Sequence, residues 1–161
     1  MEEMLEKNQF TLSLALIDAL PVLFFGAAAA VLGAKLQSAL FIVGAALCLL
    51  AGAGKVAWKV LLALKGKDVA ILGAQLRYVM PLGFLLMMLG GFFAEGETLR
   101  ALLHEAVRLP AAAFFTLTIV GIVAMVVCAK KFDRYDVRGN WIEQGINAAA
   151  QACALIGALL L

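Results

Sequence analysis

Charged side chains are scarce in this 161-residue chain. Only 15% of the residues are Asp, Glu, Lys or Arg, whereas 65% are apolar, and the mean hydropathy is +1.01. This composition excludes an ordinary soluble globule, in which about a quarter of the residues are charged. The net charge is only +2, and we expect no nucleic-acid partner.

Residues typical of catalytic and metal sites are equally few. His104 is the one histidine of the chain, and the three cysteines, Cys48, Cys128 and Cys153, lie in three different apolar runs. Such spacing provides neither a disulfide framework nor a zinc site, and no glycine-rich phosphate loop is present. We therefore expect no metal, no cofactor and no catalytic residue.

Long charge-free runs make up most of the chain instead. They lie at 19–34, 36–54, 78–94, 109–129 and 144–161. With its flanks, each run approaches the roughly 20 residues that an α-helix needs to cross the hydrocarbon core of a bilayer. We predict an all-α, polytopic integral membrane protein whose single transmembrane domain covers residues 1–161. Its five transmembrane helices are expected at 11–34, 37–64, 69–94, 110–130 and 140–161.

One segment outside these runs has a helical pattern of its own. Apolar residues of 97–109 repeat on one side of a helix, and Glu97, Arg100 and His104 fall on the other. We predict a short amphipathic helix over 97–109, lying in the membrane interface between the third and fourth spans. His104 lies on its polar face and is predicted to be a solvated surface residue.

Small residues recur at every fourth position in the first two spans. They are Gly26, Ala30 and Ala34 in the first span, and Gly44, Cys48 and Gly52 in the second. Small residues at this interval let two helix backbones approach closely in lipid. Because only a short turn separates the two spans, we predict that these faces pack together in an antiparallel hairpin.

Polar side chains interrupt the apolar runs at a limited number of positions. They are Asp18, Lys55, Trp58, Lys59, Gln75, Arg77, Tyr78, Glu143, Gln144, Asn147 and Gln151. Asp18 and Arg77 each lie shortly before a proline, which frees a backbone carbonyl one turn earlier in a helix. Because an unpaired charge is costly in lipid, Asp18 is expected to pair with one of the three bases among these residues.

The basic end of the second span has two explanations. Lys55, Trp58 and Lys59 share one helical face. In the first explanation, the lysines extend along their alkyl stems to the headgroups, and Trp58 joins the interfacial aromatic belt. In the second, all three residues line a polar site inside the membrane.

The start of the fifth span is also open to two interpretations. Glu143 lies three residues after Asn140, a spacing that predicts a capping box, but it is also a candidate buried acid. The amides of Gln144, Asn147 and Gln151 continue along one line of the helix. They either bond to a neighbouring helix or line a cavity.

Basic residues are unevenly divided between the two sides of the membrane. One side has Lys7, Lys65, Lys67, Lys130, Lys131, Arg134 and Arg138, and the other has Lys35, Arg100 and Arg108. The positive-inside rule then predicts a cytoplasmic N-terminus and an outside C-terminus. At about 1.5 Å per residue, the intramembrane polar residues lie about 9 to 16 Å from the cytoplasmic boundary.

This one-sided distribution leads to three functional hypotheses. The first is a cytoplasm-facing polar pocket that binds or transports a small anionic or amphipathic molecule, with Arg77 as its most important residue. Its candidate ligand-binding residues are Asp18, Lys55, Trp58, Lys59, Arg77, Tyr78, Asn147 and Gln151, with Glu143 and Gln144 in addition. The second is an accessory subunit that docks a partner membrane subunit, or another copy of the chain, through the polar segment 130–140. The third is an intramembrane enzyme that uses Asp18 and Glu143 as an acid pair.

Overall fold

The computed structural model describes residues 12–65, 69–132 and 137–161, and within these ranges it contains helices and no strand. This confirms the predicted all-α class for the described residues. The helices are α2 (Leu12–Ile17), α3 (Ala19–Leu36), α4 (Ala39–Lys65), α5 (Ala70–Ala74), α6 (Leu76–Phe92), α7 (Gly96–Ala106), α8 (Ala111–Lys131) and α9 (Val137–Leu160).

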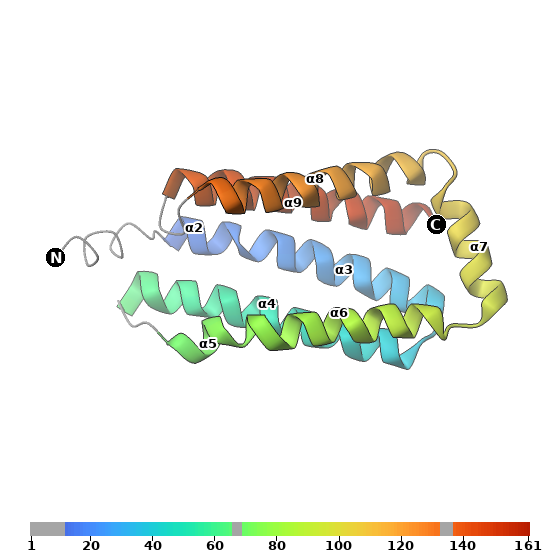
Figure 1. Cartoon of the computed structure of the whole chain (residues 1–161), viewed down its shortest axis with the longest axis horizontal. Coiled ribbons are helices and arrows are strands. Elements are labelled where there is room, and N and C mark those ends of the chain that lie inside the picture. The colour runs from blue at the N-terminus through green and yellow to red at the C-terminus, as the bar shows by residue number, and fades with distance from the viewer. Residues whose placement is uncertain (1–11, 66–68, 133–136) are drawn as a thin grey trace.

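The helices run back and forth along one long axis (Figure 1). Helix α2 continues into α3 and α5 into α6, so the chain passes along this axis in alternating directions, whereas α7 lies across one end. The bend between α6 and α7 is 106°. A helix turned away from the bundle axis in this manner agrees with the predicted amphipathic segment between the third and fourth spans.

Several helices are long and apolar enough to cross a membrane. Among the described residues these are Leu12–Leu36, Ala39–Lys65 and Ala111–Cys128, and the bent pair of α6 and α7 makes a fourth if it is one span. Helix α9 is not among them, because its amide side chains reduce its hydropathy. These apolar helices indicate a membrane location.

The first predicted span is interrupted at Asp18, where α2 ends and α3 begins. Pro21 explains the interruption, since its missing N–H leaves the carbonyl of Ile17 without its usual helical partner. Asp18 keeps helical backbone angles, with φ −62° and ψ −23°. The interruption is therefore local, and α2 and α3 follow one path through the molecule.

The third predicted span is interrupted at Gln75, between α5 and α6. The carbonyl of Gln75 accepts hydrogen bonds from the N–H groups of both Tyr78 (3.1 Å) and Val79 (2.8 Å). Such a shared acceptor is typical of a tightened helical turn. Pro81 lies inside the continuous helix α6, so this break is not at the proline.

Helices α2 and α3 lie at the centre of the bundle. Helix α4 packs on α2 and α3 from one direction and α9 from another, while α6 packs on α4 and α8 packs on α9. Figure 1 shows this order: α3 lies in the middle, α8 and α9 lie on one side of it, and α4 and α6 lie on the other side. The interruption at Asp18 therefore lies between two pairs of helices.

The predicted packing of small residues is correct in one place and wrong in another. A Cβ added to Gly52 would lie 2.9 Å from a methyl group of Val22, so Gly52 faces α3 as predicted. Gly44 instead faces α6, because a Cβ there would lie 2.5 Å from the carbonyl oxygen of Gly83. Cys48 is also turned toward α6, since a Cβ on Gly83 would lie 2.6 Å from its Sγ atom. Helix α6 has glycines of its own, and two glycine-bearing faces approach most closely.

Helix α7 closes one end of the bundle. Its Leu99 and Leu102 pack against a buried cluster that includes Ala29, Leu36 and Phe41. Part of the predicted apolar side therefore contacts the protein core. The rest of that side remains exposed, which suits a helix lying at a membrane interface.

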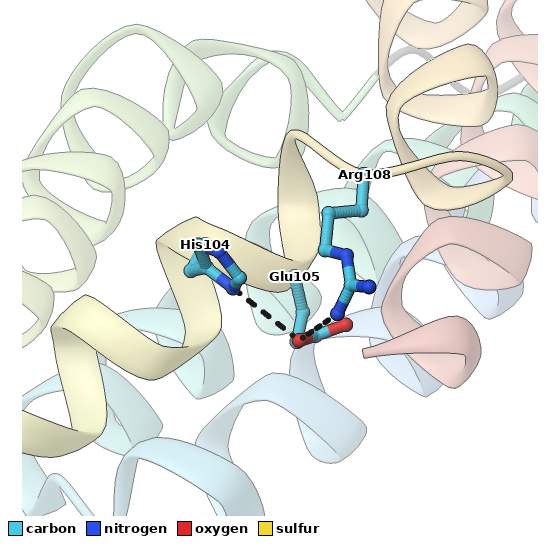
Figure 2. Close-up of polar contacts among 3 residues, drawn as sticks. All are labelled: His104, Glu105 and Arg108. Carbon is cyan, nitrogen blue, oxygen red and sulfur yellow. Dashed lines mark hydrogen bonds and ion pairs between the residues drawn. The ribbon is translucent and has the colours of Figure 1, made fainter.

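The last turn of α7 is polar. Figure 2 shows His104 and Arg108 directed at the carboxylate of Glu105. Arg108 Nη1 donates a hydrogen bond to Glu105 Oε1 at 3.1 Å, and His104 Nδ1 lies 3.5 Å from the same oxygen. The bond from Arg108 holds the pKa of Glu105 below its ordinary value. The His104 side chain is 70% exposed, which confirms that it is a surface residue.

Candidate functional site

The candidate site is built around Asp18, at the junction of α2 and α3. The backbone N–H of Asp18 still donates to the carbonyl of Leu14 at 3.3 Å, so the last turn of α2 is intact up to this residue. The residue is buried. The junction therefore holds a carboxylate inside the bundle, beside a turn that Pro21 has loosened.

Lys59 of α4 is the partner of this carboxylate. Its Nζ atom forms an ion pair with Asp18 Oδ2, and the two side chains are 5% and 1% exposed. Of the three bases that the sequence offers to Asp18, the structure brings Lys59 into contact. Asp18 is therefore paired with a base.

An apolar cluster lies beside the ion pair, within about one helical turn of Asp18 and Lys59 along the chain. Leu14 of α2 and Leu62 of α4 are buried, and Ile17 and Trp58 pack against them. In such surroundings two opposite charges attract more strongly than in water, but each has also lost its hydration. Trp58 belongs to this cluster, so its role extends beyond an interfacial anchor.

One oxygen of the Asp18 carboxylate has no partner in the described part of the chain. The Oδ1 atom is fully buried and accepts no hydrogen bond there. A buried ion pair is well stabilised only when the remaining lone pairs also find donors. The negative charge on Asp18 therefore depends largely on Lys59.

Two further charges act on Lys59. Lys55, one turn earlier on α4, repels it, and Glu143 of α9 attracts it. Both side chains are half-buried. The two acids and two bases come from the α2–α3 junction, α4 and α9, and their formal charges sum to zero.

The predicted capping box at the start of the fifth span is wrong. Helix α9 already includes Val137, so Asn140 lies inside the helix and is not its N-cap. Glu143 therefore lies in the second turn and not at a capping position. Without the cap, the remaining interpretation of Glu143 is an acid within electrostatic reach of Lys59.

The line of amides on α9 has its most buried member at Gln144. This residue is only 2% exposed, whereas Asn147 and Gln151 are half-buried. Helix α9 packs against α2, α3 and α8. The amides therefore lie on a helix that contacts both parts of the interrupted first span, which is compatible with either of the two predicted roles.

Arg77 and Tyr78 lie away from the ion pair. Both are exposed on α6, and Tyr78 is 72% exposed. The rotation of α6 about its axis explains why Arg77 and Tyr78 are exposed. Gly83 faces α4, and Arg77 precedes Gly83 by six residues. At about 100° per residue, Arg77 lies about 120° around the helix from that contact. The predicted gathering of Arg77 with Asp18 is therefore not seen.

Gln75 points in another direction from Arg77, because two residues turn a helix by about 200°. Its side-chain amide lies directly against Gly54 of α4, where an added Cβ would collide with it. Gln75 therefore lies against α4 at Gly54, the residue before Lys55.

The polar segment 130–140 can be followed only in part, because residues 133–136 lie outside the described residues.

Sequence reasoning missed the apolar residues that enclose the ion pair. Leu14 precedes Asp18 by four residues, and Leu62 follows Lys59 by three, so each shares a helical face with its charged neighbour. That spacing was the signal in the sequence by which these two residues could have been found.

Comparisons of the chain with protein-family models, with curated proteins and with solved structures found no match, so its function has to be inferred from these residues.

Proposed function

We propose that this chain is a five-span membrane protein of transporter type that binds a small amphipathic anion from the cytoplasm at the Asp18–Lys59 pair. The observation that carries the proposal is the burial of this pair beside an apolar cluster. Ionisable residues within membrane-spanning helices are rare and typically mark a substrate or ion pathway. A merely structural contact between α2 and α4 could be made by apolar residues at less cost.

The length of the helices supports five spans. Ala70–Phe92, counted through the turn at Gln75, and α9 have 23 and 24 residues, which at about 1.5 Å per residue extend about 35 Å. Both run along the same axis as the three apolar helices (Figure 1). The excess of basic residues in the loops at one end makes that end cytoplasmic, and the ion pair lies in the half of the bundle nearest to it.

The chemistry around Lys59 supports an anionic ligand with an apolar part. Lys59 is the one buried base among the described residues, and Lys55 adds a second positive charge nearby. Trp58 and the surrounding leucines offer apolar contact. Because Arg77 lies elsewhere, the anion would meet ammonium groups and not the planar fork of a guanidinium.

The interruption of the helix supplies a way into the site. Asp18 follows the start of α2 by six residues, about 9 Å along the helix axis. With the carbonyl of Ile17 freed by Pro21, the short helix α2 can tilt without breaking a full set of helical hydrogen bonds. Movement of α2 would expose Lys59 to the cytoplasmic side.

Calorimetric titration of the purified protein in lipid nanodiscs with hexanesulfonate tests this proposal. The double variant Asp18→Asn with Lys59→Gln removes both charges together, so no unpaired charge remains to unfold the protein. We expect this variant to bind hexanesulfonate at least tenfold more weakly than the unchanged chain. Lys65→Gln, an exposed lysine at the end of the same helix, is the matched control and should bind normally. Equal binding by the double variant and the unchanged chain would contradict the proposal.

The exposed surface of α6 favours a second candidate, the accessory subunit. Arg77 and Tyr78 face outward from a helix whose other side packs on α4. An arginine facing outward within a membrane span is costly unless it reaches the headgroups or meets an acid on a partner. Co-purification from native membranes distinguishes the candidates, since a subunit should bring a partner that Arg77→Ala releases.

A further inference from the structure

The charge balance of the site constrains how an anion can enter it. Asp18 and Lys59 cancel each other, as do Glu143 and Lys55, so the four groups carry no net charge. Both members of the Asp18–Lys59 pair are buried. An anion that bound Lys59 by displacing Asp18 would leave a second, unpaired negative charge in apolar surroundings, which is strongly unfavourable.

We propose that anion binding at Lys59 is coupled to protonation of Asp18, so that one proton enters the site with each monovalent anion. This inference rests on the proposed function and names its coupling ion. A proton from water forms an O–H bond with Asp18 Oδ1, and the ion pair of Lys59 with Asp18 is replaced by one with the anion. The site is neutral before the exchange, and it is neutral afterwards, because the charge of +1 on the four groups with Asp18 protonated is balanced by the bound anion.

The geometry assigns the proton to Asp18. Its Oδ1 atom is buried and accepts no hydrogen bond from the described residues, so a proton can be added there without displacing another donor. Once neutral, the carboxylic acid has lost its charge attraction to Lys59. The exchange therefore needs only the loss of the one ion pair that holds Asp18 charged.

The other charges near Lys59 fit this exchange. On its own helix Lys55 repels Lys59, and Glu143 attracts it from α9. Arg77 of α6 is exposed and is not among the charges that act on Lys59 in the described part of the chain. When Asp18 becomes neutral, the four groups carry a charge of +1, which a monovalent anion balances.

The test measures proton uptake on anion binding to the full chain in nanodiscs. Hexanesulfonate keeps its charge at every pH used, so any proton taken up belongs to the protein. Titration calorimetry in phosphate and in Tris, whose ionisation enthalpies differ, gives the number of protons per anion. We expect about one proton per anion, and an affinity that rises about tenfold for each unit by which the pH is lowered within the linked range.

Two variants assign the proton. Asp18→Asn imitates the protonated acid, and we expect it to bind hexanesulfonate with no proton uptake and an affinity independent of pH. Lys65→Gln keeps both acids and is the control at an exposed lysine of α4, and we expect proton uptake to persist. Proton uptake that survives in Asp18→Asn would overturn the assignment to Asp18.

The outcomes separate the two proposals. Binding of hexanesulfonate by the unchanged chain without proton uptake would overturn the coupling and leave the proposed function standing. Absence of any binding to the unchanged chain would overturn the proposed function, and the coupling with it. Binding that is lost only in the Asp18→Asn, Lys59→Gln double variant, together with uptake of one proton, supports both.

Discussion

Lys59 is a lysine whose charge is buried inside the helix bundle. Its ammonium is buried against the Asp18 carboxylate, and apolar side chains exclude water from both. Such a pair adds little net stability compared with apolar residues of the same volume. Removing one member is different, because the other charge is then left buried without its partner.

The residue-scale prediction concerns this asymmetry. Asp18→Asn alone and Lys59→Gln alone should each lower the free energy of unfolding by about 3 to 5 kcal/mol, because each leaves a buried charge. The double variant should recover a large part of the loss. Thermal unfolding in detergent, with Lys65→Gln as the control at an exposed lysine, measures the effect. If the losses of the single variants simply add in the double variant, the two side chains are not coupled.

At the scale of helices, glycines determine which faces meet. Gly83 of α6 approaches α4 so closely that a Cβ there would lie 2.8 Å from the carbonyl oxygen of Gly44. This contact sets the rotation of α6 and so turns Arg77 outward. The position of one arginine is thus a consequence of a contact two turns away.

Two glycines of α6 provide a matched pair for testing this contact. Gly83→Ala should destabilise the protein, because its Cβ meets Cys48 Sγ at 2.6 Å as well as backbone. The added Cβ of Gly91→Ala meets none of the described residues within 4 Å, and this variant should stabilise the helix by up to about 1 kcal/mol through helix propensity. Unfolding of both variants in detergent should therefore give shifts of opposite sign. A Gly83→Ala variant as stable as the unchanged chain would show that the α4–α6 contact does not depend on Gly83.

At the scale of the molecule, the residues of the candidate site lie toward one end of the bundle. The interrupted helices, the ion pair and the line of amides all lie toward the end at which α2 and α9 begin (Figure 1). The opposite end is closed by α7, whose Leu99 and Leu102 pack on the core. A buried ion pair near one end of the bundle and a helix across the other end suit binding from one side of the membrane.

Orientation is tested by the chemical accessibility of the two ends. With the native cysteines replaced by alanine, Lys131→Cys should react with a membrane-impermeant maleimide only from the cytoplasm. His104→Cys should react only from outside, since its side chain is exposed on α7. Lys131 is expected on the cytoplasmic side because the loops at its end of the bundle contain the excess of basic residues. The reverse labelling would invert the orientation and place the ion pair in the outer half.

The composition of the chain and the spacing of its residues were sufficient to predict much of the helical architecture. The charge-free runs predicted all-α structure, and the periodicity of 97–109 predicted α7. Asp18 and Pro21 marked the position at which the first helix is interrupted. These features are local, because helix formation and helix breaking depend on residues within one or two turns.

Only the tertiary structure decided which residues meet. Lys55, Lys59 and Arg77 were equally available to Asp18 from the sequence, and Arg77 was expected to matter most. The contact between α4 and α6 turned Arg77 outward, and the packing of α2 on α4 brought Lys59 to Asp18. Helical periodicity shows which residues share a face. The rotation of each helix in the bundle depends on close contacts between segments far apart in the chain.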